Sequence, residues 1–365
     1  ITFTTPSGSP FTNGTTYWWR TRAKDPNGGN AWSPWSQPDA FTIDTAITLS
    51  TWFQTTQEQF EQGVMTGVYA DNSDSVHVSE DIAEYATQEV PNGTWTTINT
   101  TRSYSDPIVV ASVRYNRSTE NQRTVRVRNK STDSFEVLTD NYNGTITGST
   151  TIDYFVIEAG DWLIEDGGSG TRIVAGTENV SAVAARSLPT NPGGSIVTFS
   201  PSFSSQPAVF TSITSNNDSS WVVSSVYDGS DKNNSPTAST LGLFMNRIYE
   251  SATHGAEDID YIAIEQGHGT NGTDEFDAVL TPTGSTEITD SPEAVSFSSS
   301  FSSAPGFVLI QNSSNDGGDG GYAMYHTGTS VTTAAVYAAI DEDGNGADRG
   351  HGSDEQVSAF AFEVT

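Results

Sequence analysis

The chain has 365 residues, with 15 Lys and Arg against 45 Asp and Glu, so its formal net charge is −30. A protein this acidic is not expected to bind nucleic acid, because contact with phosphates needs a basic surface. The absence of cysteine excludes disulfides, thiolate zinc sites, iron–sulfur clusters and a cysteine nucleophile. The length is typical of two to four domains, and 34% hydrophobic residues are enough for several small cores.

The first 45 residues combine aromatic and basic side chains in an alternating pattern. We expect Arg20 and Arg22 on one face of a strand and Trp32 and Trp35 on its neighbour, as a ladder of cations and rings. The segment resembles the C-terminal half of a fibronectin type III domain. The ladder would then stabilise a sandwich, with a ligand-binding aromatic patch as the alternative. Because only half of such a domain is present, we expect the protein to continue upstream or another chain to supply strands.

Beyond this segment, strand patterns alternate with turn sequences. Apolar and polar residues alternate in 124–128 and 135–138, and the short apolar runs 154–157 and 261–264 are typical of buried strands. Asn-Gly pairs and Gly-rich clusters between them mark turns. Short strands at this spacing predict an all-β fold of tandem antiparallel β-sandwich domains. The apolar runs are too short to span a membrane, so we expect no membrane insertion in this segment.

Three parts of the chain repeat one pattern. Pro107, Pro207 and Pro305 each follow an aromatic-Ser step and precede an apolar run. Each part then closes with an apolar strand that ends in Glu. Matched ends at a regular spacing indicate an internal repeat with one sandwich per unit. The predicted domains are a partial fibronectin type III-like domain at 1–45, repeat 1 with its lead-in at 46–164, repeat 2 at 165–268 and repeat 3 at 269–365.

The repeats resemble H-type lectin domains and related β-sandwich repeats of bacterial and archaeal surface proteins. The F-S-S-x-P-x-V step at 203–209, the V-R-N-x-[ST]-x-x-x-F-x-V strand pair at 127–137 and the closing Y-[IF]-[AV]-I-E strand carry this resemblance over roughly residues 90–365. It implies a β-sandwich fold and is compatible with sugar binding, since H-type lectins bind sugar in a groove at oligomer contacts. Their ligand residues have no one-by-one match here, so none is carried over.

Two histidine loops occupy equivalent places in the second and third repeats. One contains His254-Gly-Ala-Glu257 and the other His351-Gly-Ser-Asp354. The first repeat lacks the histidine. We consider two interpretations, a loop whose histidine hydrogen-bonds the end of a strand and a ligand or metal site at the tip of the sandwich. In the second interpretation His254, Glu257, His351 and Asp354 bind the ligand.

An acidic loop near the C-terminus has the oxygen spacing of a calcium site. Asp341, Asp343 and Asn345, followed by Gly346, match the first positions of an EF-hand loop, and Asp348 adds a further oxygen. The expected glutamate at the twelfth position is missing, and no flanking helices are predicted. A Ca²⁺ site and a solvated acidic turn therefore remain alternatives, and we predict no other cofactor.

Eleven Asn-x-Ser/Thr sequences are candidate N-glycosylation sites. A composition rich in Asn, Ser and Thr raises this number by chance, so used and unused sites remain alternatives. Occupied sites would mean a secreted, sugar-coated surface. The candidates are Asn13, Asn92, Asn99, Asn116, Asn129, Asn143, Asn179, Asn217, Asn233, Asn271 and Asn312.

The acidic residues are scattered along the chain, and only three lysines are present. A spread acidic surface suits a salty medium, in which screening limits self-repulsion. The exception is segment 114–130, which holds six basic residues. This segment could dock an acidic neighbour, or it could be the exposed face of two strands.

These features predict an extracellular structural and adhesive protein, a multi-domain β-sandwich subunit of a cell-surface appendage or filament that could polymerise by strand complementation. Its expected partners are further copies or other surface proteins, and glycans are a further candidate. The alternatives are a carbohydrate-binding lectin-like module and a viral or phage fibre protein. No nucleophile elbow, phosphate loop or HExxH motif is present in the sequence, so no enzyme is predicted. A glycosidase is the strongest catalytic alternative.

Overall fold

The computed structural model describes residues 16–19, 39–42 and 62–69, and then 80–363 apart from 142–145, 165–169, 182, 185–188, 248–253, 272–273, 284–287, 318–319 and 343–348. The chain divides into two compact units, 1–49 and 50–365. In the first unit, β1 (Thr16–Trp19) pairs antiparallel with β2 (Asp39–Thr42). The predicted ladder of Arg20, Arg22, Trp32 and Trp35 lies outside the described residues.

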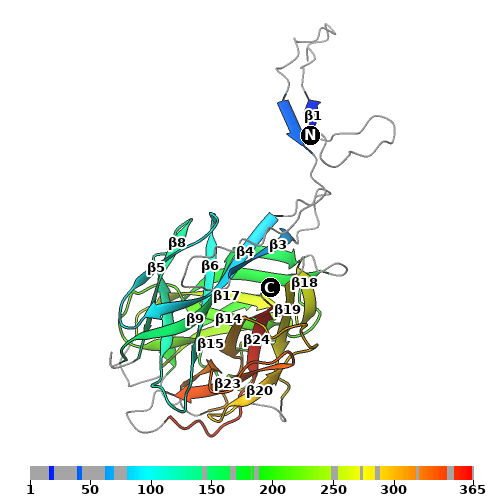
Figure 1. Cartoon of the computed structure of the whole chain (residues 1–365). Helices are drawn as coiled ribbons and strands as arrows, with labels where there is room; N and C mark the ends of the chain where they lie inside the picture. The colour runs from blue at the N-terminus through cyan, green and yellow to red at the C-terminus, as the bar shows by residue number, and fades with distance from the viewer. Residues whose placement is uncertain are drawn as a thin grey trace. The chain divides into compact units, whose positions relative to one another are not determined.

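In the second unit the three repeats are each built from six equivalent strands, and Figure 1 labels strands of all three, among them β4, β14 and β24. Repeat 1 contains β4 (Glu80–Pro91), β5 (Thr96–Asn99), β6 (Pro107–Tyr115), β7 (Thr124–Arg128), β8 (Ser134–Asp140) and β9 (Ser149–Glu158). Repeat 2 contains β11 (Thr171–Val180), β13 (Ser195–Thr198), β14 (Ala208–Ile213), β15 (Val222–Tyr227), β16 (Thr240–Arg247) and β17 (Glu257–Ile264). Repeat 3 contains β19 (Asp274–Leu280), β20 (Glu293–Ser296), β21 (Phe307–Asn312), β22 (Gly321–His326), β23 (Ala335–Glu342) and β24 (Val357–Phe362).

Each repeat is a sandwich of an inner and an outer three-stranded antiparallel sheet. The inner sheets are β4-β9-β6, β11-β17-β14 and β19-β24-β21, and the outer sheets are β5-β8-β7, β13-β16-β15 and β20-β23-β22. A short strand, β12 (Val183–Ala184), adds to β16 in parallel. All the secondary structure in the described residues is strand, so the predicted all-β fold of tandem antiparallel sandwiches is confirmed.

An arm strand precedes each repeat and pairs antiparallel with the first strand of that repeat. The arms are β3 (Gln62–Tyr69), β10 (Gly160–Ile164) and β18 (Gly267–Asn271). β3 also pairs with β10, and β22 meets β6 in a short parallel contact. Strand pairing therefore joins repeat 1 to both of the other repeats. The arms of repeats 2 and 3 begin slightly before the predicted boundaries at 165 and 269.

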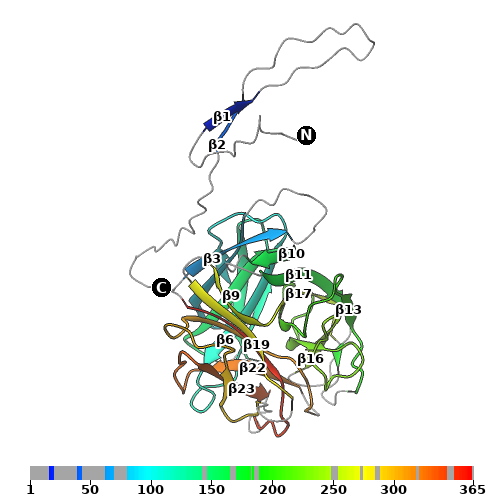
Figure 2. The same ribbon diagram turned by 90° about the vertical axis from the view of Figure 1, so that its right-hand side faces the viewer.

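The inner sheets bury both of their faces, which explains their nearly continuous apolar runs. On β6, Val109 packs inside its own sandwich with Ile98 and Phe135. Its neighbours Ile108 and Val110 instead enter a core shared by all three repeats, to which repeat 3 contributes phenylalanines of β19, β21 and β24. Figure 2 shows the repeats gathered about these inner strands, with β13 and β16 of repeat 2 to one side. The shared core makes one unit of the three repeats.

The strand register revises the sequence alignment of the third repeat by one residue. Pro107 faces the closing glutamate of repeat 1, whereas in repeat 3 Phe307 faces Phe362, so Gly306 stands where Pro107 stands. The loop that follows Phe301 is one residue longer than the loop that follows Phe203, which accounts for the offset.

Candidate functional site: the seams between the repeats

Three equivalent hydrogen bonds between the inner sheets run in one cyclic direction. Each donor is a backbone N–H on the third strand of one repeat, and each acceptor is a side chain on the last strand of the next repeat. The pairs are Val109 to Asp260 (2.7 Å), Val209 to Ser358 (3.2 Å) and Val308 to Asp153. The three acceptors all stand five residues before the closing glutamate of their repeat. The repeats are thus related by a pseudo-threefold axis. We call their contacts the first seam (repeats 1 and 2), the second seam (2 and 3) and the third seam (3 and 1).

Two of these acceptors are completely buried carboxylates, and each has a cation beside it. At the first seam the Lys130 ammonium lies 2.6 Å from one oxygen of Asp260 and 2.7 Å from the other. At the third seam Arg114 pairs with Asp153 and also donates to the carbonyl of Gly306 in repeat 3 (2.6 Å). Burial raises the pKa of both aspartates, and the adjacent cations act in the opposite direction.

The second seam has a neutral acceptor at the same position. Ser358 accepts from the Val209 N–H, and its hydroxyl lies 2.7 Å from that of Ser313. A hydroxyl needs no counter-ion when it is buried, and a carboxylate does. The two seams whose acceptor is a carboxylate therefore carry a cation beside it, Lys130 at the first seam and Arg114 at the third.

A second set of cations reaches from each repeat into the loop between the third and fourth strands of the next. These cations donate to backbone carbonyls, which closes the loop onto the neighbouring repeat. Arg126 bonds the carbonyls of Ser215 (3.4 Å) and Asp218 (3.1 Å), Lys232 those of Asn315 and Gly317 (3.1 Å), and Arg349 those of Arg117 (3.1 Å) and Glu120 (2.6 Å). The basic segment 114–130 therefore docks onto the chain's own second repeat through Arg126 and Lys130.

The predicted residues His254 and Glu257 lie together at the first seam. Glu257 is fully buried and accepts from Arg126 (3.0 Å), the Ser215 hydroxyl, and the backbone N–H groups of residues 217 and 218. His254 Nε2 lies 3.2 Å from Glu257, and its Nδ1 lies 2.8 Å from the Ser220 hydroxyl. Burial opposes ionisation of Glu257, but these hydrogen bonds outweigh it and lower its pKa to about 2. In this arrangement His254 and Glu257 hold the loop of repeat 2 that Arg126 enters.

His351 occupies the equivalent place at the second seam. Its Nδ1 lies 2.6 Å from Glu342 and its Nε2 lies 3.1 Å from Glu355. Glu355 holds the loop that Lys232 enters, because it accepts from the Ser314 hydroxyl (2.7 Å) and from the N–H groups of residues 316 and 317. Burial alone would lower the pKa of His351, but the two glutamates raise it to about 9.

Neither Glu342 nor Glu355 was predicted from the sequence as a partner of His351. The predicted partner Asp354 is exposed, and Glu355 is the buried residue that corresponds to Glu257. Both Glu257 and Glu355 stand eight residues before the closing glutamate of their repeat. This spacing could have identified Glu355. Nothing in the local sequence indicates Glu342, because it reaches His351 from a neighbouring strand.

Of the predicted calcium ligands, only Asp341 is among the described residues. Its buried carboxylate is paired with Arg349 and accepts a hydrogen bond from the Tyr115 hydroxyl. Asp343, Asn345 and Asp348 lie outside the described residues. Within the described part of the chain, no group of three or more His, Asp or Glu side chains is placed to hold a metal ion. The Ca²⁺ site stays a prediction.

The predicted glycosylation sites differ in their access to solvent. The exposed asparagines are Asn99, Asn129, Asn179, Asn217 and Asn233, and the half-buried ones are Asn92 and Asn116. Asn271 and Asn312 are 3% and 2% exposed, so a glycan there would have to displace packed neighbours. Asn13 and Asn143 lie outside the described residues.

The chain is similar to halomucin of Haloquadratum walsbyi (strain DSM 16790 / HBSQ001). The two are 27% identical over 273 residues, which is 69% of this chain and 3% of halomucin. The chain therefore spans a small part of the curated relative that it matches. No family model matches the chain, and no solved structure matches it. In the part of the chain that the structure describes, no helix is long and apolar enough to cross a membrane.

Proposed function

We propose that this chain is part of an extracellular cell-surface protein, in which residues 50–365 act as a rigid structural and adhesive head. The observation that carries this proposal is the cyclic closure of three sandwiches by buried hydrogen bonds and cations at the seams. In that closure the buried acids, histidines and cations bind one another. Such mutually paired groups stabilise a fixed shape.

The charge distribution supports a location in a salty medium. Both lysines of the described residues, Lys130 and Lys232, are bound at seams, so the surface charge of the head is dominated by carboxylates. At high ionic strength the repulsion among such charges is screened within a few ångströms. The similarity to halomucin supports the cell-surface location. The resemblance of the repeats to H-type lectin-like repeats of surface proteins, and that of 1–45 to half of a fibronectin type III domain, belong to the same proposal.

As a subunit of a surface appendage or filament, the chain would bind further copies of itself or other surface proteins. A rigid head favours adhesion, because a pre-organised surface loses little conformational entropy on binding. Three sandwiches in one chain also repeat related surfaces at fixed separations, and such multivalency raises avidity without any new contact.

Immunogold labelling of intact cells that produce the protein tests the location. We expect antibodies against the full chain to label the cell exterior, and protease treatment of intact cells to remove the label. Label that appears only after permeabilisation would overturn the proposal. Label on virus particles and not on cells would replace it with a fibre protein.

Beads coated with the full chain test adhesion separately. We expect them to bind one another or producing cells at high salt, and uncoated beads to bind neither. Saturable binding to one defined glycan, with no binding between coated beads, would replace the adhesive role with that of a lectin. Absence of all binding would leave a purely structural subunit and contradict the adhesive part of the proposal.

A further inference from the structure

The three arm strands differ in how many of their edges are paired. β3 pairs with β4 on one edge and with β10 on the other, and β10 lies between β3 and β11. β18 stands at the end of its sheet, and no described strand pairs with its second edge. Figure 1 labels β18 and β19 side by side near the margin of the head. The arm of repeat 3 therefore keeps an open edge, whereas the arms of repeats 1 and 2 cover each other.

The open edge of β18 corresponds to the edge of β10 that β3 covers. Gly160 and Gly267 begin the two arms with similar positive φ angles, 147° and 143°, and each pairs with an alanine of the first strand of its repeat. Counted from these glycines, Trp162 of β10 matches Gly269 of β18. β3 pairs with β10 at this point, through Tyr69. A strand of the same kind is therefore expected beside Gly269.

Both faces of β18 are packed on repeat 3, which holds its edge in place. Successive side chains of a strand point to opposite faces. On one face the Phe276 ring lies so close to Gly269 that a Cβ there would meet it at 2.5 Å. On the other face the His268 ring packs edge-on against Phe301, with ring centroids 5.3 Å apart. A strand that is already fixed loses little conformational entropy when another strand pairs with it.

Within the described residues, β18 shows none of the devices that usually protect an edge strand. Such strands commonly carry charged residues, proline or a bulge. The sequence of β18, Gly-His-Gly-Thr-Asn, contains no proline and no Asp, Glu, Lys or Arg. Its pairing with β19 is regular, whereas the pairing of β3 with β4 is bulged at Met65. Thr270 is exposed, and the three residues before it are half-buried. The edge is therefore accessible to a further strand.

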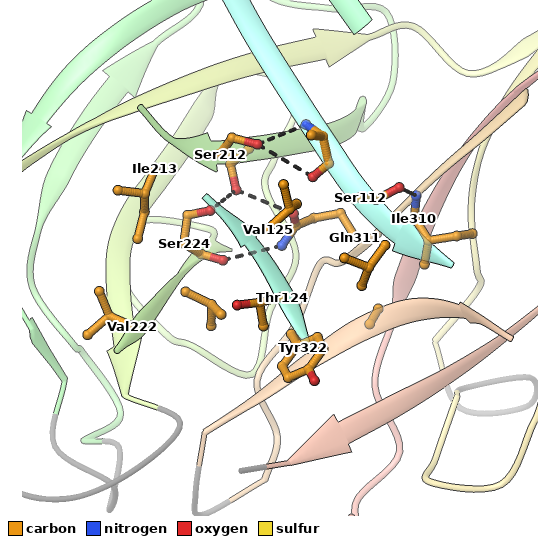
Figure 3. Close-up of a pocket in the computed structure, with 15 residues that line it drawn as sticks. Ser112, Thr124, Val125, Ser212, Ile213, Val222, Ser224, Ile310, Gln311 and Tyr322 are labelled. Carbon is orange, nitrogen blue, oxygen red and sulfur yellow. Dashed lines mark hydrogen bonds between the residues drawn. The ribbon is translucent and has the colours of Figure 1, made fainter. Parts of the chain in front are cut away.

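The third strands of the inner sheets, which also stand at sheet edges, are closed by contacts between the repeats. The Ala111 N–H donates to the Ser212 hydroxyl (2.9 Å), and the Ile310 N–H donates to the Ser112 hydroxyl (3.4 Å). Figure 3 shows these contacts at Ser212 and between Ser112 and Ile310. Among the arms and inner sheets of the described residues, β18 is the strand left with an open edge. A matching open arm is then available only from another chain.

We propose that β18 pairs antiparallel with β18 of a second copy of this chain. The pairing of β3 with β10 shows that arms of this protein pair antiparallel with one another. Two identical antiparallel strands are related by a twofold axis, so each copy presents the same surface. The sheet β18-β19-β24-β21 then continues into its counterpart through strand addition. The proposal rests on the proposed function, because it names the contact through which that surface protein would bind its own copies.

This contact should be weak and should be favoured by salt. A pair of five-residue strands buries less than the roughly 1,200 Å² of a stable interface. The dimer is therefore expected at high protein concentration, as on a crowded surface. The net charge of −30 on each copy opposes association at low ionic strength, whereas at 1 M salt the Debye length is only about 3 Å. Each copy has one β18, so this contact stops at two copies.

Sedimentation velocity of the full chain, at several protein concentrations in low and high sodium chloride, tests the dimer. We expect monomers at low salt and a monomer–dimer equilibrium at high salt. Thr270→Lys should abolish the dimer, because lysine on an edge strand opposes pairing. Thr97→Lys should leave it unchanged. Thr97 is the matched control, since it is an exposed threonine on β5, an end strand of an outer sheet, and both threonines face a glutamate on the adjacent strand.

A wild type that stays monomeric at high salt would overturn the proposal, and so would a dimer that Thr270→Lys leaves intact. Circular dichroism checks that both variants are folded. These measurements use purified protein and do not depend on where the protein resides. Failure of the β18 contact is thus distinguishable from failure of the proposed location, which immunogold labelling tests.

Pulsed electron paramagnetic resonance identifies the paired strand. The chain has no cysteine, so Thr270→Cys carries a single nitroxide label. In any antiparallel register that pairs three or more residues of β18, the two Thr270 positions lie within roughly 15 Å of each other. We expect a correspondingly short distance between labels at high salt, and no such distance with Thr97→Cys. A dimer with only long distances between Thr270 labels would place the contact elsewhere, for example on β1 or β2, and would overturn the proposal.

Discussion

The first and second seams are equivalent contacts between repeats, but charged pairs hold the first where neutral groups hold the second. The first buries two ion pairs, Lys130 with Asp260 and Arg126 with Glu257. The second replaces the aspartate by Ser358, and its lysine, Lys232, bonds neutral carbonyls. A buried ion pair is costly to break but adds little net stability over a neutral replacement. The seams should therefore differ much less in strength than in their response to mutation and pH.

The largest difference is expected when each acceptor on the last strand is truncated. Asp260→Ala leaves the Lys130 ammonium, the Val109 N–H and two threonine hydroxyls without their acceptor. We expect a loss of about 4 kcal/mol in the free energy of unfolding. Ser358→Ala removes a neutral acceptor and should cost about 1 kcal/mol. Urea unfolding at constant high salt measures both, and similar losses would show that the charge at the first seam is immaterial.

Alkaline pH should weaken the second seam through His351. Its pKa in the folded protein is about 9, above the ordinary value of 6.5. A raised pKa means that the protonated form stabilises the fold, so this stability is complete below pH 6.5 and is lost as the pH rises through about 9. The shift corresponds to about 3 kcal/mol. We expect the stability difference between wild type and His351→Gln to shrink over this range. A difference independent of pH would contradict the ion triad with Glu342 and Glu355.

Acid should weaken the first seam through Glu257, the counterpart of Glu355. The pKa of Glu257 is lowered from 4.5 to about 2, so its contribution is present above pH 4.5 and is lost as the pH falls through about 2. We expect a contribution of about 2–3 kcal/mol. Glu257→Gln, which keeps an acceptor oxygen, should remove this part of the acid dependence. An unchanged acid midpoint in the variant would assign the dependence to other carboxylates.

The sequence predicted the all-β fold and its threefold repeat because those signals are local. Alternation, turn residues and the closing Glu recur within each repeat. The seams could not be predicted, because they join residues at least 83 positions apart and depend on register. His351 lies four residues before Glu355, whereas His254 lies three residues before Glu257, so the spacing of the second repeat pointed to Asp354 in the third. One clue was available: the unbroken apolar run Ile108-Val109-Val110 indicates burial on both faces of its strand, and the second face is the shared core.

The smallest effect is expected from converting the first seam into a copy of the second. Lys130→Met together with Asp260→Ser removes both charges and places a hydroxyl where Ser358 stands in repeat 3. The Val109 N–H and the hydroxyls of Thr177 and Thr214 then keep a polar neighbour, and no charge is left buried. We expect a change of about 1 kcal/mol or less in the free energy of unfolding, far below that of Asp260→Ala alone. The double variant should also lose the salt dependence that this ion pair contributes. If the double variant were as unstable as Asp260→Ala, the ion pair would be needed to hold repeats 1 and 2 together. A neutral acceptor like that of the second seam could then not replace it.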